Sequence, residues 1–289
     1  MVMVDKFVEV DGIRTRYLEE GEGHPIVLFH GGEFGGNTGA HVFPPEFYKG
    51  FGEAGHRAVG IDRLGQAQTD NPRTHEDYRI SAVIAHSIAT LEALSITNAT
   101  VLGQSRGAYV AARIAVERPD LVRRLVLINS GTLAPGVGVE PKPGELTYAV
   151  YNEMMTGEAR NDAEALSYTF DHITDAWLEE CQRYADAEKS KEARSVLSSV
   201  ERAYFDEFAA QKDDTLDRLA AGGYTGPTLI VWGVGDRTLT HESSIALFNV
   251  FKDQSEHLRM HVINHAGHSV FREYPDEVSR QVVDFIATT

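Results

Sequence analysis

Three residues in this sequence have the side chains needed to cleave a carbonyl compound. Ser105 stands between Gly103 and Gly107 in the segment GQSRG, Asp236 follows the apolar run PTLIVWG, and His268 ends the segment HAGH. A serine hydroxyl becomes a nucleophile when a histidine takes its proton, and that histidine needs a carboxylate to fix its tautomer and stabilise its cation. We therefore expect Ser105 as nucleophile, His268 as general base and Asp236 as the acid that orients it.

The glycines that flank Ser105 indicate a sharp corner between a strand and a helix. The apolar run ATVLGQ precedes the serine, and RGAYVAARIAVERP follows it with a helical pattern. Glycine removes the Cβ atoms that would clash at such a corner, and the first turn of the helix offers free N–H groups to a developing oxyanion. The pattern predicts a nucleophile elbow in which the amide of Arg106 is one oxyanion donor.

The glycine-rich segment VLFHGGEFGG predicts the second oxyanion donor. We expect the amide of Gly32 to supply it, while His30 braces the loop. The segment lacks both G-x-G-x-x-G and the lysine of a P-loop, so a phosphate cradle is not expected. Glu33 and Phe34 in this loop are candidate substrate contacts.

Two of these assignments have rivals. His265 competes with His268, which we favour because it follows a glycine that allows a tight loop and precedes the last helix. Asp62 is a weaker rival of Asp236, because it lies one strand too early and in a turn, DRLGQAQTD, that we expect to shape the pocket rim. HAGH has no nearby cysteine or carboxylate cluster, so we expect no metal site and no cofactor.

Strand and helix patterns alternate along most of the chain. KFVEV and IRTRYLEE, joined at Asp11 and Gly12, predict an antiparallel hairpin. Six apolar runs predict further strands: PIVLFH, RAVGID, ATVLGQ, RLVLIN, PTLIVWG and LRMHVIN. Segments 81–94 and 276–287 have apolar residues at helical spacing. The alternation predicts an α/β fold with a doubly wound, mostly parallel sheet, formed by residues 1–131 and 226–289.

Residues 132–225 interrupt this alternation, because they contain no convincing strand. The segment begins with the Gly/Pro-rich loop GTLAPGVGVEPKPG. Apolar residues then recur at helical spacing: Trp177, Cys181 and Tyr184, followed by Val196, Val200 and Tyr204. We expect a helical cap over the site, with Trp177 and Arg183 as candidate substrate contacts; a separate helical domain with no role in the site is the alternative.

Composition restricts the partners. The formal net charge of −16 over 289 residues argues against nucleic acid and anionic membranes. The single cysteine excludes an intrachain disulfide framework. No stretch approaches the roughly 20 apolar residues of a membrane span, and charges come too early for a signal peptide. We expect a cytoplasmic protein with a small-molecule substrate; whether it forms a homo-oligomer stays open.

The chain as a whole resembles the α/β-hydrolase family. The resemblance rests on HGG at 30–32, DRLGQAQTDNP at 62–72, GQSRG, WGVGDR and HAGHSVFREYPDEV, and on the Ser, Asp, His order of the triad. It implies the α/β-hydrolase fold with an inserted cap and a cofactor-free serine hydrolase. Within the family the chain looks most similar to the meta-cleavage-product hydrolases, which split a carbon–carbon bond beside a ketone, on VDGIRTRYLEEGEG, HGGEFGG and TDAWLEE.

Three positions depart from the pattern of those enzymes. Ser269 follows the histidine where they carry tryptophan, and Cys181 occupies the place of a cap arginine that binds the acidic end of the dienone, with Arg183 two residues away. Arg106 stands where methionine is frequent; it either contacts a substrate carboxylate or pairs with an acidic neighbour. We therefore slightly favour an ester or lactone substrate. Carbon–carbon cleavage is the alternative, and a ligand-binding or lyase member of the fold is a further one.

Overall fold

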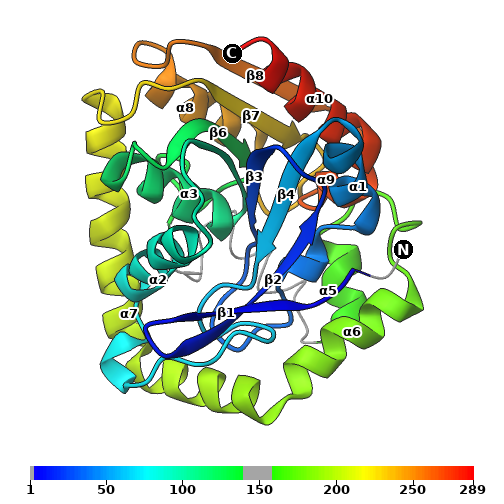
Figure 1. Cartoon of the computed structure of the whole chain (residues 1–289), viewed down its shortest axis with the longest axis vertical. Coiled ribbons are helices and arrows are strands. Elements are labelled where there is room, and N and C mark those ends of the chain that lie inside the picture. The colour runs from blue at the N-terminus through cyan, green and yellow to red at the C-terminus, as the bar shows by residue number, and fades with distance from the viewer. Residues whose placement is uncertain (1–2, 139–157) are drawn as a thin grey trace.

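A computed structural model describes residues 3–138 and 158–289, and an eight-stranded sheet forms its centre (Figure 1). The strands lie in the order β1-β2-β4-β3-β5-β6-β7-β8, and all from β3 to β8 are parallel. Their bounds are β1 Lys6–Val10, β2 Ile13–Glu20, β3 His24–Phe29, β4 His56–Ile61, β5 Ala99–Gln104, β6 Val122–Ile128, β7 Thr228–Gly233 and β8 Leu258–Ile263. The predicted doubly wound α/β fold is confirmed.

The predicted hairpin is also confirmed, and the turn explains its sequence. β1 and β2 pair antiparallel, with Val10 opposite Ile13. The two residues between them, Asp11 and Gly12, have φ of 49° and 74°. A two-residue hairpin of this kind needs positive φ at both positions, which Asp-Gly tolerates.

Helices cover both faces of the sheet. They are α1 Pro45–Glu53, α2 Ile80–Ala93, α3 Arg106–Glu117, α8 His241–Phe251, α9 Val270–Glu273 and α10 Pro275–Ala287, with short 3₁₀ helices at Ala40–Val42 and His75–Asp77. Side chains of α2, α3 and α8 pack in one apolar cluster, and those of α1, α9 and α10 pack in the other. Successive residues of β3 alternate between the two clusters, as strand geometry requires. Two buried layers therefore hold the sheet edge that carries the candidate site.

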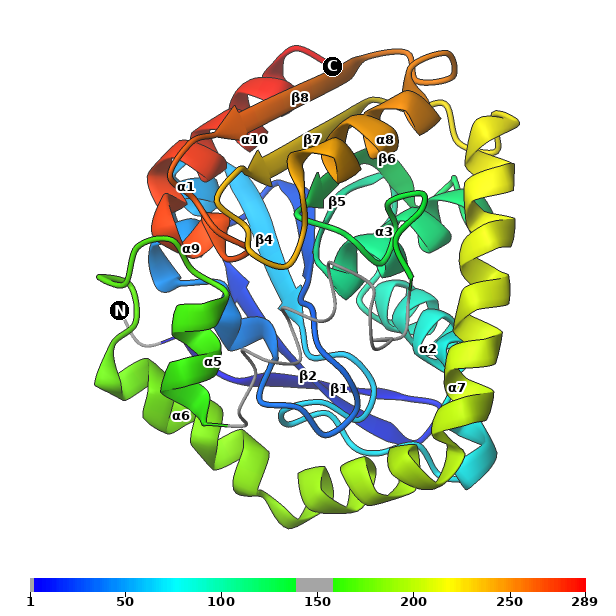
Figure 2. The ribbon, with the colours of Figure 1, turned by 180° about the vertical axis from the view of Figure 1, so that it is seen from behind.

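Between β6 and β7 the described residues contain helices and no strand. These helices are α5 Ala159–Ala165, α6 Asp175–Asp186 and α7 Glu188–Ala220. Figure 2 shows them running around one end and one side of the sheet. The expected Gly/Pro-rich loop lies partly outside the described residues, since 139–157 are not among them. The long α7 also contacts α2, α3 and α8 of the core, so the division into core and cap at 132 and 225 stays a prediction.

Within the described ranges, no helix has both the length and the apolar composition needed to cross a membrane.

At the corner between β5 and α3, beside Ser105, backbone segments pass very close to one another. A Cβ on Gly107 would lie 2.0 Å from the carbonyl oxygen of Phe29, and one on Gly103 would lie 2.2 Å from the carbonyl oxygen of Gly107. Neither neighbour is a flexible side chain that could move aside. The two glycines are therefore required by the close passage of β3, β5 and α3.

We expect Gly107→Ala to destabilise the protein by about 1–3 kcal/mol, because the added methyl forces backbone apart in a packed interior. It should also slow labelling of Ser105 by a serine-directed fluorophosphonate. Urea unfolding and the labelling rate measure the two effects. Gly52→Ala is the control, because Gly52 of α1 has no positive φ, and the atom nearest the added Cβ is 3.3 Å away in the flexible Glu20 side chain. If Gly107→Ala unfolds and labels as wild type does, the packing argument is wrong.

Candidate functional site

Ser105 occupies a strained backbone position at the carboxyl end of β5. Its φ of 54° and ψ of −123° lie where non-glycine residues are rarely found. The Ser105 amide donates to the carbonyl of Ile128 at 2.9 Å, and the Ser130 hydroxyl donates to the Ser105 carbonyl at 2.8 Å. Both bonds fix the serine from β6 and the loop after it. The strain presents the Ser105 side chain to a pocket at the edge of the sheet.

His268 and Asp236 meet beside the same pocket. His268 Nδ1 donates to Asp236 Oδ2 at 2.7 Å, which leaves Nε2 as the atom able to take a proton. Asn129 Nδ2 donates to Asp236 at 2.9 Å, and Thr238 donates through its amide at 2.8 Å and its hydroxyl at 2.6 Å. Burial raises the pKa of Asp236, but His268 and these donors outweigh it and hold that pKa below its usual value. The carboxylate is therefore ionised at neutral pH.

The two rival residues lie in other environments. His265 is exposed and stacks on Tyr168, with the ring centroids 5.2 Å apart. Asp62 is fully buried and receives Arg16 Nη1 on both oxygens at 3.1 Å, together with the amides of Ala40 and Gln68. The structure thus pairs His268 with Asp236, while Asp62 joins β2 to the loop after β4.

The expected oxyanion donors face the pocket from two loops. Gly32 has φ of 85°, and a Cβ there would lie 2.1 Å from Thr38 Oγ1. Gly32 and Arg106 both line the pocket, and no acceptor in the described part of the chain takes a hydrogen bond from either amide. Two unused N–H groups beside a serine are what an oxyanion hole requires. Their role stays a prediction.

His30 and Arg63 hold the glycine-rich loop in place. His30 Nδ1 donates to the Gly31 carbonyl at 2.8 Å, and its Nε2 accepts from the Arg63 amide at 3.1 Å, so the ring is neutral. Burial lowers the pKa of His30 well below its usual value. Arg63 Nη2 donates to the carbonyls of Gly31 and Gly32 at 2.8 and 2.7 Å. Sequence reasoning missed Arg63, whose only signal is its place just after a strand.

Arg106 pairs with an acidic neighbour. Its guanidinium contacts the Glu33 carboxylate, Tyr204 donates to Glu33 at 2.6 Å, and the Phe208 ring centre lies 5.1 Å from the Arg106 guanidinium carbon. Of the two roles the sequence left open for Arg106, the structure shows the ion pair. Because the pair neutralises both charges, Arg106 is not a free cation for a substrate carboxylate.

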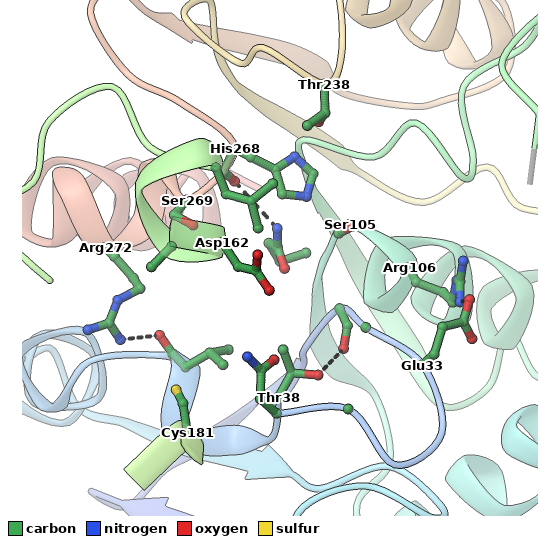
Figure 3. Close-up of a pocket in the computed structure, with 18 of the residues that line it drawn as sticks. Glu33, Thr38, Ser105, Arg106, Asp162, Cys181, Thr238, His268, Ser269 and Arg272 are labelled. Atoms are coloured by element: carbon green, nitrogen blue, oxygen red, sulfur yellow. Dashed lines mark hydrogen bonds and ion pairs between the residues drawn. The ribbon is translucent and has the colours of Figure 1, made fainter. Parts of the chain in front are cut away.

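The pocket has a volume of about 400 Å³ and lies between the sheet edge and the cap helices (Figure 3). Its lining includes Trp177 and Cys181 of α6, as well as Glu33 and Arg106. Two expected contacts are corrected. Phe34 is buried against Tyr78 and Tyr204 and does not line the pocket, because it packs into the core.

Arg183 is the second correction. Its side chain is 67% exposed, pairs with Glu180 and lies over the Tyr184 ring on the outside of α6. It is two residues from Cys181, and a two-residue step on a helix turns a side chain away from the face of the first. The pocket instead contains a cation that sequence reasoning missed, Arg272 of α9. The sequence feature that could have indicated Arg272 is its position four residues after His268.

We expect Asp236→Asn to lower turnover of p-nitrophenyl acetate by about 10⁴-fold, because the amide favours the wrong tautomer of His268. Unfolding in urea should change much less. Asp62→Asn is the matched control with the opposite profile: it removes the buried charge that faces Arg16, so it should cost about 3–5 kcal/mol of stability. A larger loss of turnover in folded Asp62→Asn than in Asp236→Asn would reassign the acid.

Comparison with known proteins agrees with this geometry. A family model described as alpha/beta hydrolase fold matches residues 24–275. A 2-hydroxy-6-oxo-6-(2'-aminophenyl)hexa-2,4-dienoic acid hydrolase of Metapseudomonas resinovorans is 24% identical and covers 98% of this chain and 91% of its own. A 2-hydroxy-6-oxo-6-phenylhexa-2,4-dienoate hydrolase of Comamonas testosteroni is 27% identical, with 93% and 90% covered.

A solved structure shares the fold. The meta-cleavage product hydrolase of Pseudomonas fluorescens IP01 superposes with a TM-score of 0.77 at 22% identity, covering 98% of this chain and 97% of that chain. At this identity the likeness concerns the fold. The family model, however, matches most of the sequence. The two similar curated proteins are named as hydrolases, and the similarity covers nearly the whole length of each. The chain therefore belongs to the alpha/beta hydrolase family and is a hydrolase.

Proposed function

We propose that this hydrolase cleaves the carbon–carbon bond beside the ketone of a 2-hydroxy-6-oxo-dienoate. The observation that carries the proposal is the hydrogen bond between His268 and Asp236 at the pocket that Ser105 also lines. Similar proteins that span this chain almost completely are named for that substrate class. They favour this reaction over the ester or lactone reaction that the sequence slightly favoured.

The proposed reaction begins with a proton transfer. The dienol of the substrate loses its hydroxyl proton and gains one on the carbon next to the distant ketone, so that this carbon can leave. Ser105 Oγ then attacks the ketone carbon while His268 Nε2 takes the hydroxyl proton, and Asp236 stabilises the imidazolium. The amides of Gly32 and Arg106 hold the oxygen of the tetrahedral adduct.

Cleavage follows from collapse of that adduct. The carbon–carbon bond breaks, its electron pair moves into the leaving dienolate, and an acyl group stays on Ser105. The leaving dienolate takes the proton from His268, which is then free to act as base again. Water then attacks the acyl carbon with His268 as base, and the products are a carboxylic acid and a 2-hydroxydienoate. Each step forms a tetrahedral adduct with a negatively charged oxygen, and the same oxyanion site would stabilise both adducts. One triad can therefore serve both halves of the reaction.

Stopped-flow absorbance with a phenyl-substituted ring-fission dienone tests the proposal. Wild type should discharge the dienolate band, and Ser105→Ala should lose about 10⁴-fold or more in cleavage rate because only binding and the oxyanion site remain. p-Nitrophenyl acetate turnover in the same preparation controls for active enzyme. A preparation that turns over this ester but leaves the dienolate band unchanged at high enzyme concentration would overturn the carbon–carbon proposal in favour of an ester or lactone.

A further inference from the structure

We propose that Arg272 is the carboxylate-binding residue of the pocket and holds the acidic end of the substrate from the core side rather than from the cap. The inference deepens the proposed function, on which the identity of the carboxylate rests. Arg272 belongs to α9, four residues after His268, and its side chain is buried with the residue 7% exposed. Figure 3 shows it across the pocket from Ser105 and His268.

The Arg272 guanidinium has polar contacts but forms no ion pair with a carboxylate of the described residues. Nη1 donates to the Val42 carbonyl at 2.6 Å, and Nη2 donates to the His172 carbonyl at 3.3 Å. The Trp177 ring centre lies 3.9 Å from its central carbon. No carboxylate in the described ranges forms an ion pair with it, and Nε is buried without an acceptor there. A buried charge without a partner is costly, so such a group marks a place for an anion.

Comparison with the other cation of the pocket, Arg106, supports Arg272 as the carboxylate-binding residue. Arg106 is neutralised by Glu33, and its guanidinium lies on the Ser105 side. Burial lowers the pKa of Arg272 to about 10, so it keeps its charge at neutral pH. Among the described lining residues, Arg272 is therefore the cation whose charge is left for a ligand.

The chemistry of the site favours a single carboxylate. A guanidinium has five N–H groups in a planar fork, and two of those of Arg272 are used by carbonyls. Nη1 and Nη2 each keep one further N–H that a carboxylate oxygen can accept. The ligand is thus an anion whose carboxylate is separated from the reacting carbonyl by a chain that crosses the pocket.

Cys181 of α6 is uncharged, so the positive charge at this end of the pocket comes from Arg272 of α9. Its thiol lines the pocket near Arg272, and burial raises its pKa to about 12, so it stays neutral. The position where the family resemblance led us to expect a cap arginine therefore carries no charge. Arg272 reaches the same end of the pocket from α9.

The test compares two esters of equal length. 4-Acetoxybutanoate carries a carboxylate at the end of its leaving alcohol, on the side where the leaving dienoate carries its own, and butyl acetate ends in a methyl group. We expect wild type to prefer the acetoxybutanoate ester, and Arg272→Met to lower the acetoxybutanoate-to-butyl-acetate ratio of kcat/KM by about 10- to 150-fold, the scale of a charged hydrogen bond. Arg272→Lys should recover part of the ratio, since it keeps the charge but not the fork. The loss should fall mainly on KM.

The matched variant is Arg183→Met, which removes the exposed cap arginine. If the ratio falls in Arg183→Met and not in Arg272→Met, or if Arg272→Met lowers both esters equally, the inference is overturned. Wild type decides the case if Arg272→Met does not fold, because a wild-type enzyme that does not prefer 4-acetoxybutanoate over butyl acetate also overturns the inference. The ester ratio is independent of carbon–carbon cleavage, so an Arg272-dependent preference with no dienone cleavage would sink the proposed function alone.

Discussion

The strained backbone of Ser105 is the constraint on which the site depends. A left-handed φ at a non-glycine residue persists only where the surroundings over-determine it. Here β5 and α3 approach so closely that Gly103 and Gly107 leave no room for side chains, and β6 holds the serine through Ile128. The corner therefore fixes Ser105, the expected nucleophile, at the end of a strand that is buried throughout. The expected base and the glycine-rich loop then need only reach this fixed point.

Buried charges show how each loop is placed relative to that point. Asp236 and Asp62 both follow a strand, yet one orients a histidine and the other binds Arg16, because their donors differ. Lys212 of α7 donates to three carbonyls after β6, at 3.2, 2.7 and 2.5 Å from Gly131, Ala134 and Val137. In each case the charge has its partners within the protein. Among the described residues that line the pocket, Arg272 is the cation without a carboxylate partner, which is why it points to the ligand.

The sequence predicted what depends on local pattern. Apolar runs of strand length and the glycine pair around Ser105 can be recognised without knowing their neighbours, and the strands follow these runs closely. Contacts across the fold could not be predicted in this way. Arg106 finds Glu33 because two loops meet, and Phe34 turns into the core although its loop borders the pocket. Arg183 is not a pocket residue because it lies two positions after Cys181 on α6, so its side chain leaves the helix on another face.

The charges of the pocket are placed as the proposed reaction requires. Near Ser105, the Glu33–Arg106 pair is neutral as a whole, so the field that stabilises an oxyanion comes from fixed amides rather than from a mobile side chain. A free cation at that end would attract the substrate carboxylate to the nucleophile and bind the substrate backwards. With Arg272 across the pocket from Ser105 and His268, a substrate of the class proposed above would have one favourable orientation, with its ketone at Ser105.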